Sequence, residues 1–173
     1  MSAEAFTRLH VGVSLVALAA ALVTLLAMIG RRGLPGVTAL FLAASILTGL
    51  SDGIFAASRF GAQQIVAIVS LAALAIAVFA LYVRRLAGVW RAAYVLSATL
   101  ALWLNVALAV RLAFQTVPAL AILAPTETEP PYFAAQGGVL VLFVCLAALA
   151  FNNFPGPAAP KSADRPDLPS SAA

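Results

Sequence analysis

Apolar residues occupy five long stretches of the chain, separated by short polar connections. The stretches cover residues 9–30, 34–57, 65–83, 92–110 and 134–152. Because a helix rises about 1.5 Å per residue, each stretch is long enough to cross a hydrocarbon core of about 30 Å. The pattern predicts an all-α membrane protein, a bundle of five transmembrane helices whose membrane domain occupies residues 1–154.

The apolar pattern continues beyond the fourth stretch, over residues 111–124, where Pro118 interrupts it. A proline breaks or restarts a helix because it has no backbone N–H to donate. We therefore expect a short interfacial helix at the outer surface, with Thr116 as its cap. After Phe154 the composition changes to proline, alanine and serine, which predicts a disordered cytoplasmic tail over residues 155–173.

The composition is that of a protein solvated by lipid. Hydrophobic residues make up 64% of the chain and charged residues 9%, whereas soluble domains carry about a quarter charged residues. The net charge of +4 does not indicate nucleic-acid binding, because the basic residues lie at the ends of apolar stretches rather than in one patch. The first apolar stretch is longer than the apolar region of a signal peptide, about 7–15 residues, and it ends in Arg31 and Arg32 rather than at a cleavage site of the A-x-A kind, which predicts a retained span.

The basic residues also predict the orientation. In a five-span arrangement most of them lie on one side of the bilayer: Arg31, Arg32, Arg84, Arg85, Arg91, Lys161 and Arg165. The positive-inside rule then predicts a bacterial inner (cytoplasmic) membrane protein with a periplasmic N-terminus and a cytoplasmic C-terminus.

Asp52 lies about 27 Å along the second stretch, close to the outer boundary. Three interpretations remain open for its carboxylate. Asp52 and Gly53 end a helix at the interface, or Asp52 forms an interhelical ion pair with Arg111, which we place at a similar depth. The third is a site that carries a proton or an ion. The same segment contains small residues every four positions, Ser45, Gly49, Gly53 and Ala57, which predict close helix packing within the bundle or self-association.

The polar inventory argues against catalysis and against a bound cofactor. His10 is the only histidine and Cys145 is the only cysteine, so we predict no catalytic residue, cofactor or metal ligand. Cys145 is expected to be buried as a small apolar side chain. Asn105 is expected to hydrogen-bond to a neighbouring helix. Glu127, Glu129 and Tyr132 lie in a proline-rich connection that we interpret as an outer loop for contact with a partner.

Two adjoining segments, "GVWRAAYVLSATLALWLNVALAVRLAFQTVPAL" and "LAPTETEPPYFAAQG", carry a resemblance over residues 88–137. They resemble a group of small, uncharacterised integral inner-membrane proteins of Gram-negative bacteria, in which F-Q-x-x-P-A-L leads into L-A-P-T-x-x-E-P-P-[FY] and a final span. The matching residues are Phe114, Gln115, Pro118, Ala119 and Leu120, then Leu123 to Thr126 and Glu129 to Tyr132. The resemblance implies a bacterial inner-membrane location, and no activity or catalytic residue carries over from it.

We therefore expect a non-catalytic accessory, scaffold or sensor subunit that contacts the lipid bilayer and either a membrane-protein partner or a second copy of itself. One alternative is an oligomeric permease or channel component, which predicts that Asp52, Asn105 or Arg111 lines an internal cavity. A second alternative is a membrane enzyme or electron carrier that holds a cofactor.

Overall fold

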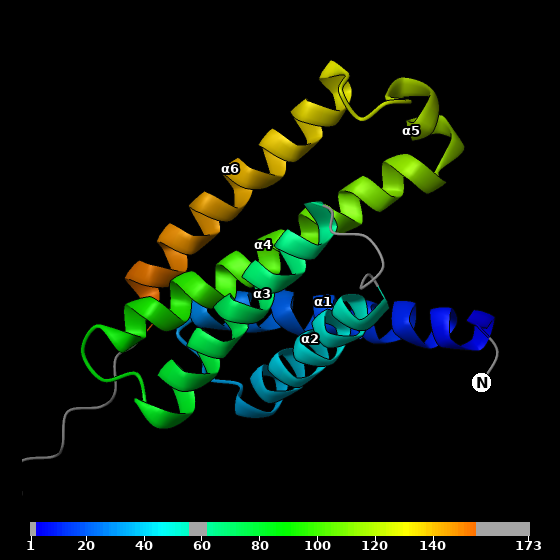
Figure 1. Ribbon diagram of the computed structural model, residues 1–173. Coiled ribbons are helices and arrows are strands. Elements are labelled where there is room, and N and C mark those ends of the chain that lie inside the picture. The colour runs from blue at the N-terminus through cyan, green and yellow to red at the C-terminus, as the bar shows by residue number, and fades with distance from the viewer. Residues whose placement is uncertain (1–2, 56–61, 155–173) are drawn as a thin grey trace, which may run out of the picture.

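The protein is a bundle of helices joined by short connections (Figure 1). The computed structural model describes residues 3–55 and 62–154, and the side chains of residues 9–51 and 64–154. Its helices are α1 (Ala3–Ile29), α2 (Pro35–Phe55), α3 (Ala62–Val78), the π-helical turn η2 (Phe79–Val83), α4 (Trp90–Thr116), α5 (Pro118–Leu123) and α6 (Pro130–Asn153). The five predicted stretches thus coincide with α1, α2, α3 with η2, α4 and α6.

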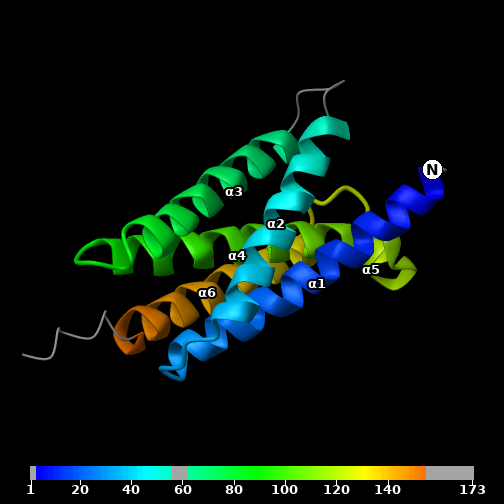
Figure 2. The same cartoon turned by 90° about the horizontal axis from the view of Figure 1, so that it is seen from below.

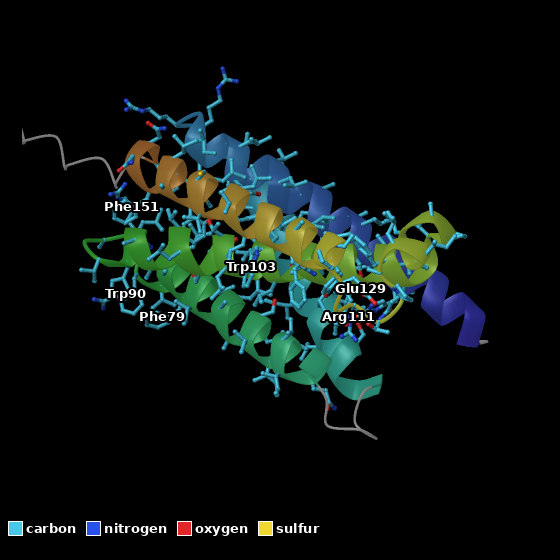
Figure 3. The ribbon with its side chains drawn as sticks, turned by 90° about the horizontal axis from the view of Figure 1, so that it is seen from above. Phe79, Trp90, Trp103, Arg111, Glu129 and Phe151 are labelled. Carbon is cyan, nitrogen blue, oxygen red and sulfur yellow. The ribbon has the colours of Figure 1, made fainter. Side chains whose placement is uncertain are left out.

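Helix α4 lies at the centre of the bundle. It packs against α1, α3 and α6, while α2 lies across α1 and α3 (Figure 2). One end, which we call the arginine end, carries Arg31, Arg32, Arg84, Arg85 and Arg91. The opposite end, the glutamate end, carries Glu127 and Glu129 on the connection between α5 and α6. Figure 3 shows Trp90 and Phe151 near the arginine end and Arg111 and Glu129 near the glutamate end.

The buried core lies in the half of the bundle next to the arginine end. Its members come from the last turns of α1, α3 and α6 and from the first half of α4, with Phe41 and Leu42 from α2. Ala77, Ala80, Ala101 and Ala150 are fully buried. Because alanine is small, helix backbones can approach closely at these positions, which is how helices gain packing energy in lipid.

Among the described residues, four helices are long and apolar enough to cross a membrane: α1, α3 with η2, α4 and α6. The described apolar part of α2, Pro35–Ser51, is shorter at 17 residues. The prediction of an α-helical membrane protein is therefore confirmed, while the predicted count of five spans is not. Large apolar side chains cover the outside of these helices, for example Leu140 and Val144 on α6.

Three details differ from the expectations or fall beyond the described residues. The short helix α5 begins at Pro118 as its proline predicts, but the residue before it is Val117, and the hydroxyl of Thr116 donates to Leu112 O of α4 instead of capping α5. Cys145 is exposed on the surface of α6 rather than buried, because it faces away from the helices that pack against α6. The predicted tail, residues 155–173, lies outside the described residues.

Candidate functional site

A network of hydrogen bonds joins the end of α4 to the connection before α6. Arg111 Nε donates to Glu127 Oε2 at 2.8 Å, and Gln115 Nε2 donates to Glu127 Oε1 at 2.5 Å. Both donors lie on α4, one turn apart, so they reach the same carboxylate. The charges of Arg111 and Glu127 therefore offset each other at the glutamate end.

The path of the backbone brings Glu127 to this position. Val117 has an extended conformation because it precedes Pro118, and this break turns the chain away from the axis of α4. Helix α5 and the following turn then lead back, with Ala124 buried and Glu127 at a φ of 60°. A positive φ is unfavourable for a residue with a side chain, so the bonds to Glu127 help to hold this turn in place.

Glu129 is engaged on the other side of the same turn. Its carboxylate accepts hydrogen bonds from the Thr126 hydroxyl at 2.7 Å, from the Thr126 backbone N–H at 3.2 Å and from the Thr128 backbone N–H at 3.0 Å. These donors, the Thr126 hydroxyl first, lower the pKa of Glu129 below its usual value. The carboxylate also lies beside the N-terminus of α6, where a negative charge is favourable.

Tyr132 and Gln136 connect α6 to α4. Gln136 Nε2 donates to Ala107 O at 3.0 Å and to the Tyr132 hydroxyl at 3.1 Å. The Tyr132 ring packs edge-on against Phe114, with the ring centroids 5.4 Å apart. The three residues that we expected to contact a partner, Glu127, Glu129 and Tyr132, are thus each bonded within the chain.

A cavity of about 320 Å³ opens between α1 and α4, where these helices separate toward the glutamate end (Figure 1). Leu15, Leu18 and Leu108 form part of its apolar wall. Its polar side chains are His10, Ser14, Thr48, Asn105, Arg111 and Gln115. We call it the outer cavity.

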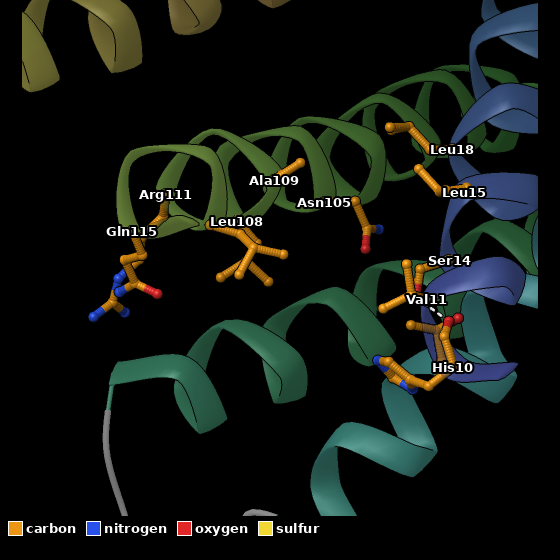
Figure 4. A pocket seen from close by; sticks show the side chains of 12 residues that line it. His10, Val11, Ser14, Leu15, Leu18, Asn105, Leu108, Ala109, Arg111 and Gln115 are labelled. Carbon is orange, nitrogen blue, oxygen red and sulfur yellow. Dashed lines mark hydrogen bonds between the residues drawn. The ribbon is translucent and has the colours of Figure 1, made fainter. Parts of the chain in front are cut away.

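Asn105 is the central polar residue of the outer cavity. Its Nδ2 donates to Ala101 O at 2.9 Å, within its own helix rather than to the neighbouring helix that we had expected. Among the described residues, no donor reaches the amide oxygen of Asn105. Figure 4 shows this side chain pointing away from α4, toward the space beside Ser14 and His10. The Asn105 oxygen is therefore positioned to accept a hydrogen bond from a molecule in the cavity.

Two further cavities follow along the contact between α1 and α4. One, of about 10 Å³, is lined by Thr24, Phe41 and Thr99 among others. The buried Thr99 hydroxyl has no hydrogen-bond partner among the described residues. The other, of about 280 Å³, lies at the arginine end and also reaches Thr24; we call it the inner cavity. Buried side chains, including Leu25 and Leu102, separate the outer cavity from the inner one.

The remaining predicted residues are only partly described. The side chain of Asp52 lies outside the described residues, so its pairing with Arg111 stays a prediction, although Arg111 binds Glu127. Ser45 is buried and Gly49 packs against Leu71 of α3, while the side-chain positions of Gly53 and Ala57 are outside the described residues. Within residues 9–51 and 64–154, no group of three or more His, Cys, Asp or Glu side chains is placed to hold a metal ion.

Comparisons with protein-family models, with curated proteins and with solved structures find no match to this chain. The resemblance of residues 88–137 to small inner-membrane proteins therefore stays a prediction.

Sequence reasoning named Asn105 and Arg111 as residues that would line a cavity in a permease, and both line the outer cavity, but it did not predict the bond between Arg111 and Glu127. Arg111 and Glu127 are 16 residues apart and come together only because the chain reverses after Pro118. The break at Pro118 and the short apolar segment that follows were the available signals for this reversal. The position of His10 and Ser14 opposite Asn105 had no such signal, because it depends on how α1 packs against α4.

Proposed function

We propose that the protein is a non-catalytic sensor or accessory subunit of the bacterial inner membrane that binds a small amphipathic molecule in the outer cavity. Five spans, a periplasmic N-terminus and a cytoplasmic C-terminus belong to this proposal, and they place the outer cavity near the periplasmic surface. The observation that carries it is the Asn105 oxygen, which accepts no hydrogen bond from the described part of the chain and lies in a cavity of about 320 Å³. Ligand sites are commonly apolar cavities with a few fixed polar groups.

The cavity also indicates the chemistry of its ligand. The charge of Arg111 is offset by Glu127, which favours an uncharged molecule over an ion. The Asn105 oxygen requires a donor, such as a hydroxyl or N–H group. The leucines of the wall favour an apolar body. A molecule of this kind enters the cavity from the bilayer or from its surface, and the occupied cavity holds α1 and α4 at one separation.

The separation of α1 and α4 can serve as the signal of a sensor, because each helix leads into a different connection. Helix α4 leads through Arg111 and Gln115 into the bonded turn at Glu127, which is the surface proposed for partner contact. A ligand that shifts α4 therefore shifts this turn as well.

Native mass spectrometry of the protein extracted gently from its own membrane tests the proposal. We expect a small-molecule adduct on the unchanged chain and its loss in Leu108→Trp, which fills the cavity. Leu96→Trp is the matched control, because Leu96 lies on the same helix, is 55% exposed and does not line the cavity. Absence of an adduct on the unchanged chain, or equal loss in both variants, would contradict the proposal.

A second proposal is an oligomeric permease or channel component, favoured by the row of three cavities along α1 and α4. A pathway between them requires the side chains around Thr24 and Thr99 to separate. Cysteines introduced there singly, in a Cys145→Ser background, test this directly. Labelling of Ala21→Cys and Thr99→Cys, which line the small cavity but neither of the larger ones, by a membrane-impermeant thiol reagent favours the permease, whereas protection of both favours a closed bundle and the sensor.

A further inference from the structure

The inner cavity is a second, separate site, at the arginine end of the bundle. It has a volume of about 280 Å³ and lies between the end of α1, the start of α2, η2 and the start of α4. Its polar side chains are Thr24, Arg32, Thr38, Tyr82 and Tyr94. Its apolar wall includes Met28, Leu81 and Phe154. Cation, hydroxyls and apolar surface are therefore gathered in one cavity.

Among the described residues, the charge around this cavity is of one sign. The described side chains at the arginine end include Arg31, Arg32, Arg84, Arg85 and Arg91, whereas the described carboxylates, Glu127 and Glu129, lie at the opposite end. Arg91 Nη1 donates to Phe151 O and Phe154 O, and Arg84 lies over the Trp90 ring, 5.2 Å from its centroid. Of the five arginines, Arg32 alone lines the cavity.

The end of α1 determines which arginine reaches the cavity. Arg31 N donates to Met28 O at 3.2 Å and Arg32 N donates to Ala27 O at 2.8 Å, with Arg31 at a φ of 58°. This pair of bonds is the Schellman ending of a helix, in which a left-handed residue reverses the chain direction. The reversal places Arg32 on the cavity wall, while the neighbouring Arg31 does not line it, although both side chains are exposed.

The start of α2 adds a second attraction for an anion. Pro35 begins α2 and lines the cavity together with Thr38, in the first turn of the helix. The N-terminus of a helix carries a partial positive charge and N–H groups that are not used inside the helix. Thr38 and Tyr94 are both buried and both line the cavity, so their hydroxyls are available to a ligand oxygen there.

We propose that the inner cavity binds the phosphate and glycerol of an anionic phospholipid. Arg32 and the start of α2 attract the phosphate, the hydroxyls of Thr38 and Tyr94 bond its oxygens, and the apolar wall contacts the beginning of the acyl chains. Basic cavities between membrane helices bind such head groups because the phosphate lies at the depth where helices end. The largely apolar wall favours a lipid over free phosphate, which would leave that surface exposed to water.

The test uses the full chain in detergent, with phosphatidylglycerol or phosphatidylcholine added, and native mass spectrometry to count bound lipid. We expect phosphatidylglycerol to be retained and phosphatidylcholine to be lost. Arg32→Gln should lower the affinity for phosphatidylglycerol about 10-fold, the effect of one charge-assisted hydrogen bond. Arg31→Gln is the matched control, because it removes the same charge from the adjacent residue outside the cavity.

Equal losses in Arg31→Gln and Arg32→Gln would show that diffuse surface charge binds the lipid and would overturn the proposal. So would equal retention of the two lipids, or protection against thermal unfolding by inorganic phosphate alone at the level given by phosphatidylglycerol. Tyr94→Phe removes one hydroxyl without a change of charge and should lower the affinity several-fold if the lipid occupies the cavity. An unchanged affinity in this variant would also contradict the proposal.

Discussion

Gly49 offers the sharpest test of the packing between α2 and α3. A Cβ atom added at Gly49 would lie 2.9 Å from Leu71 Cδ2 and 3.1 Å from Leu71 Cγ. Carbon atoms in contact are normally about 3.5–4.0 Å apart. Gly49→Ala therefore forces Leu71 or the helices to move, even though alanine is the better helix former.

Two opposing contributions set the expected magnitude. Alanine in place of glycine inside a helix stabilises by up to about 1 kcal/mol. Overpacking a well-filled contact costs about 1–3 kcal/mol. We expect Gly49→Ala to lower the free energy of unfolding by about 0–2 kcal/mol, the difference of these two terms. In a Leu71→Ala background the overlap is gone, and the same substitution should instead stabilise by up to about 1 kcal/mol.

The assay is reversible unfolding in mixed micelles with increasing denaturing detergent, followed by circular dichroism, for the complete double-mutant cycle. Gly138→Ala is the control, because Gly138 lies inside α6 and an added Cβ would meet no atom within 4 Å. This control should be neutral or stabilising. If Gly49→Ala raises the free energy of unfolding as much as Gly138→Ala does, and its effect does not depend on Leu71, the close packing is refuted.

Three further predictions concern single side chains. Glu127→Gln should lower the free energy of unfolding by about 0.5–1 kcal/mol, a small value because the ion pair of Arg111 and Glu127 is partly exposed. The substitution should also speed amide hydrogen exchange in the turn before α6, and an unchanged exchange rate would contradict this prediction. Bonds from Thr126 and Thr128 lower the pKa of Glu129, so the stabilisation by the Glu129 carboxylate is present above the ordinary glutamate pKa of 4.5 and is lost as the pH falls through the lowered pKa. An NMR titration of the Glu129 carboxyl that shows no lowering of its pKa would refute this prediction. Thr99→Val should raise the free energy of unfolding by about 1 kcal/mol, because it removes a buried hydroxyl that has no hydrogen-bond partner among the described residues. A lower free energy of unfolding in the same detergent assay would mean that water satisfies this hydroxyl in the small cavity.

The sequence alone determined the class of the protein and the extent of its helices. Apolar residues over stretches of about 20 positions leave the backbone no partner in lipid except itself, so helices are the only solution for such stretches. Pro118 likewise determined where α4 ends and α5 begins, because its ring and its missing N–H act locally. These predictions depend only on neighbouring residues, which is why they could be read from the chain.

The functional sites were decided by the tertiary structure. The exposed faces of these helices carry many large apolar side chains, as the buried faces do, so composition does not reveal which face of α1 turns toward α4, and hence which polar residues share a cavity. The left-handed residue at the end of α1 is Arg31, although a glycine lies on either side of the two arginines, at positions 30 and 33. The left-handed conformation of Arg31, rather than of a glycine, places Arg32 on the wall of the inner cavity. Asn105 and Thr99 lie on the same helix with similar surroundings in the sequence, yet one faces an open cavity and the other a space of about 10 Å³. Such differences arise because α1 and α4 pack closely around Thr99 and separate toward the glutamate end, which no local pattern specifies.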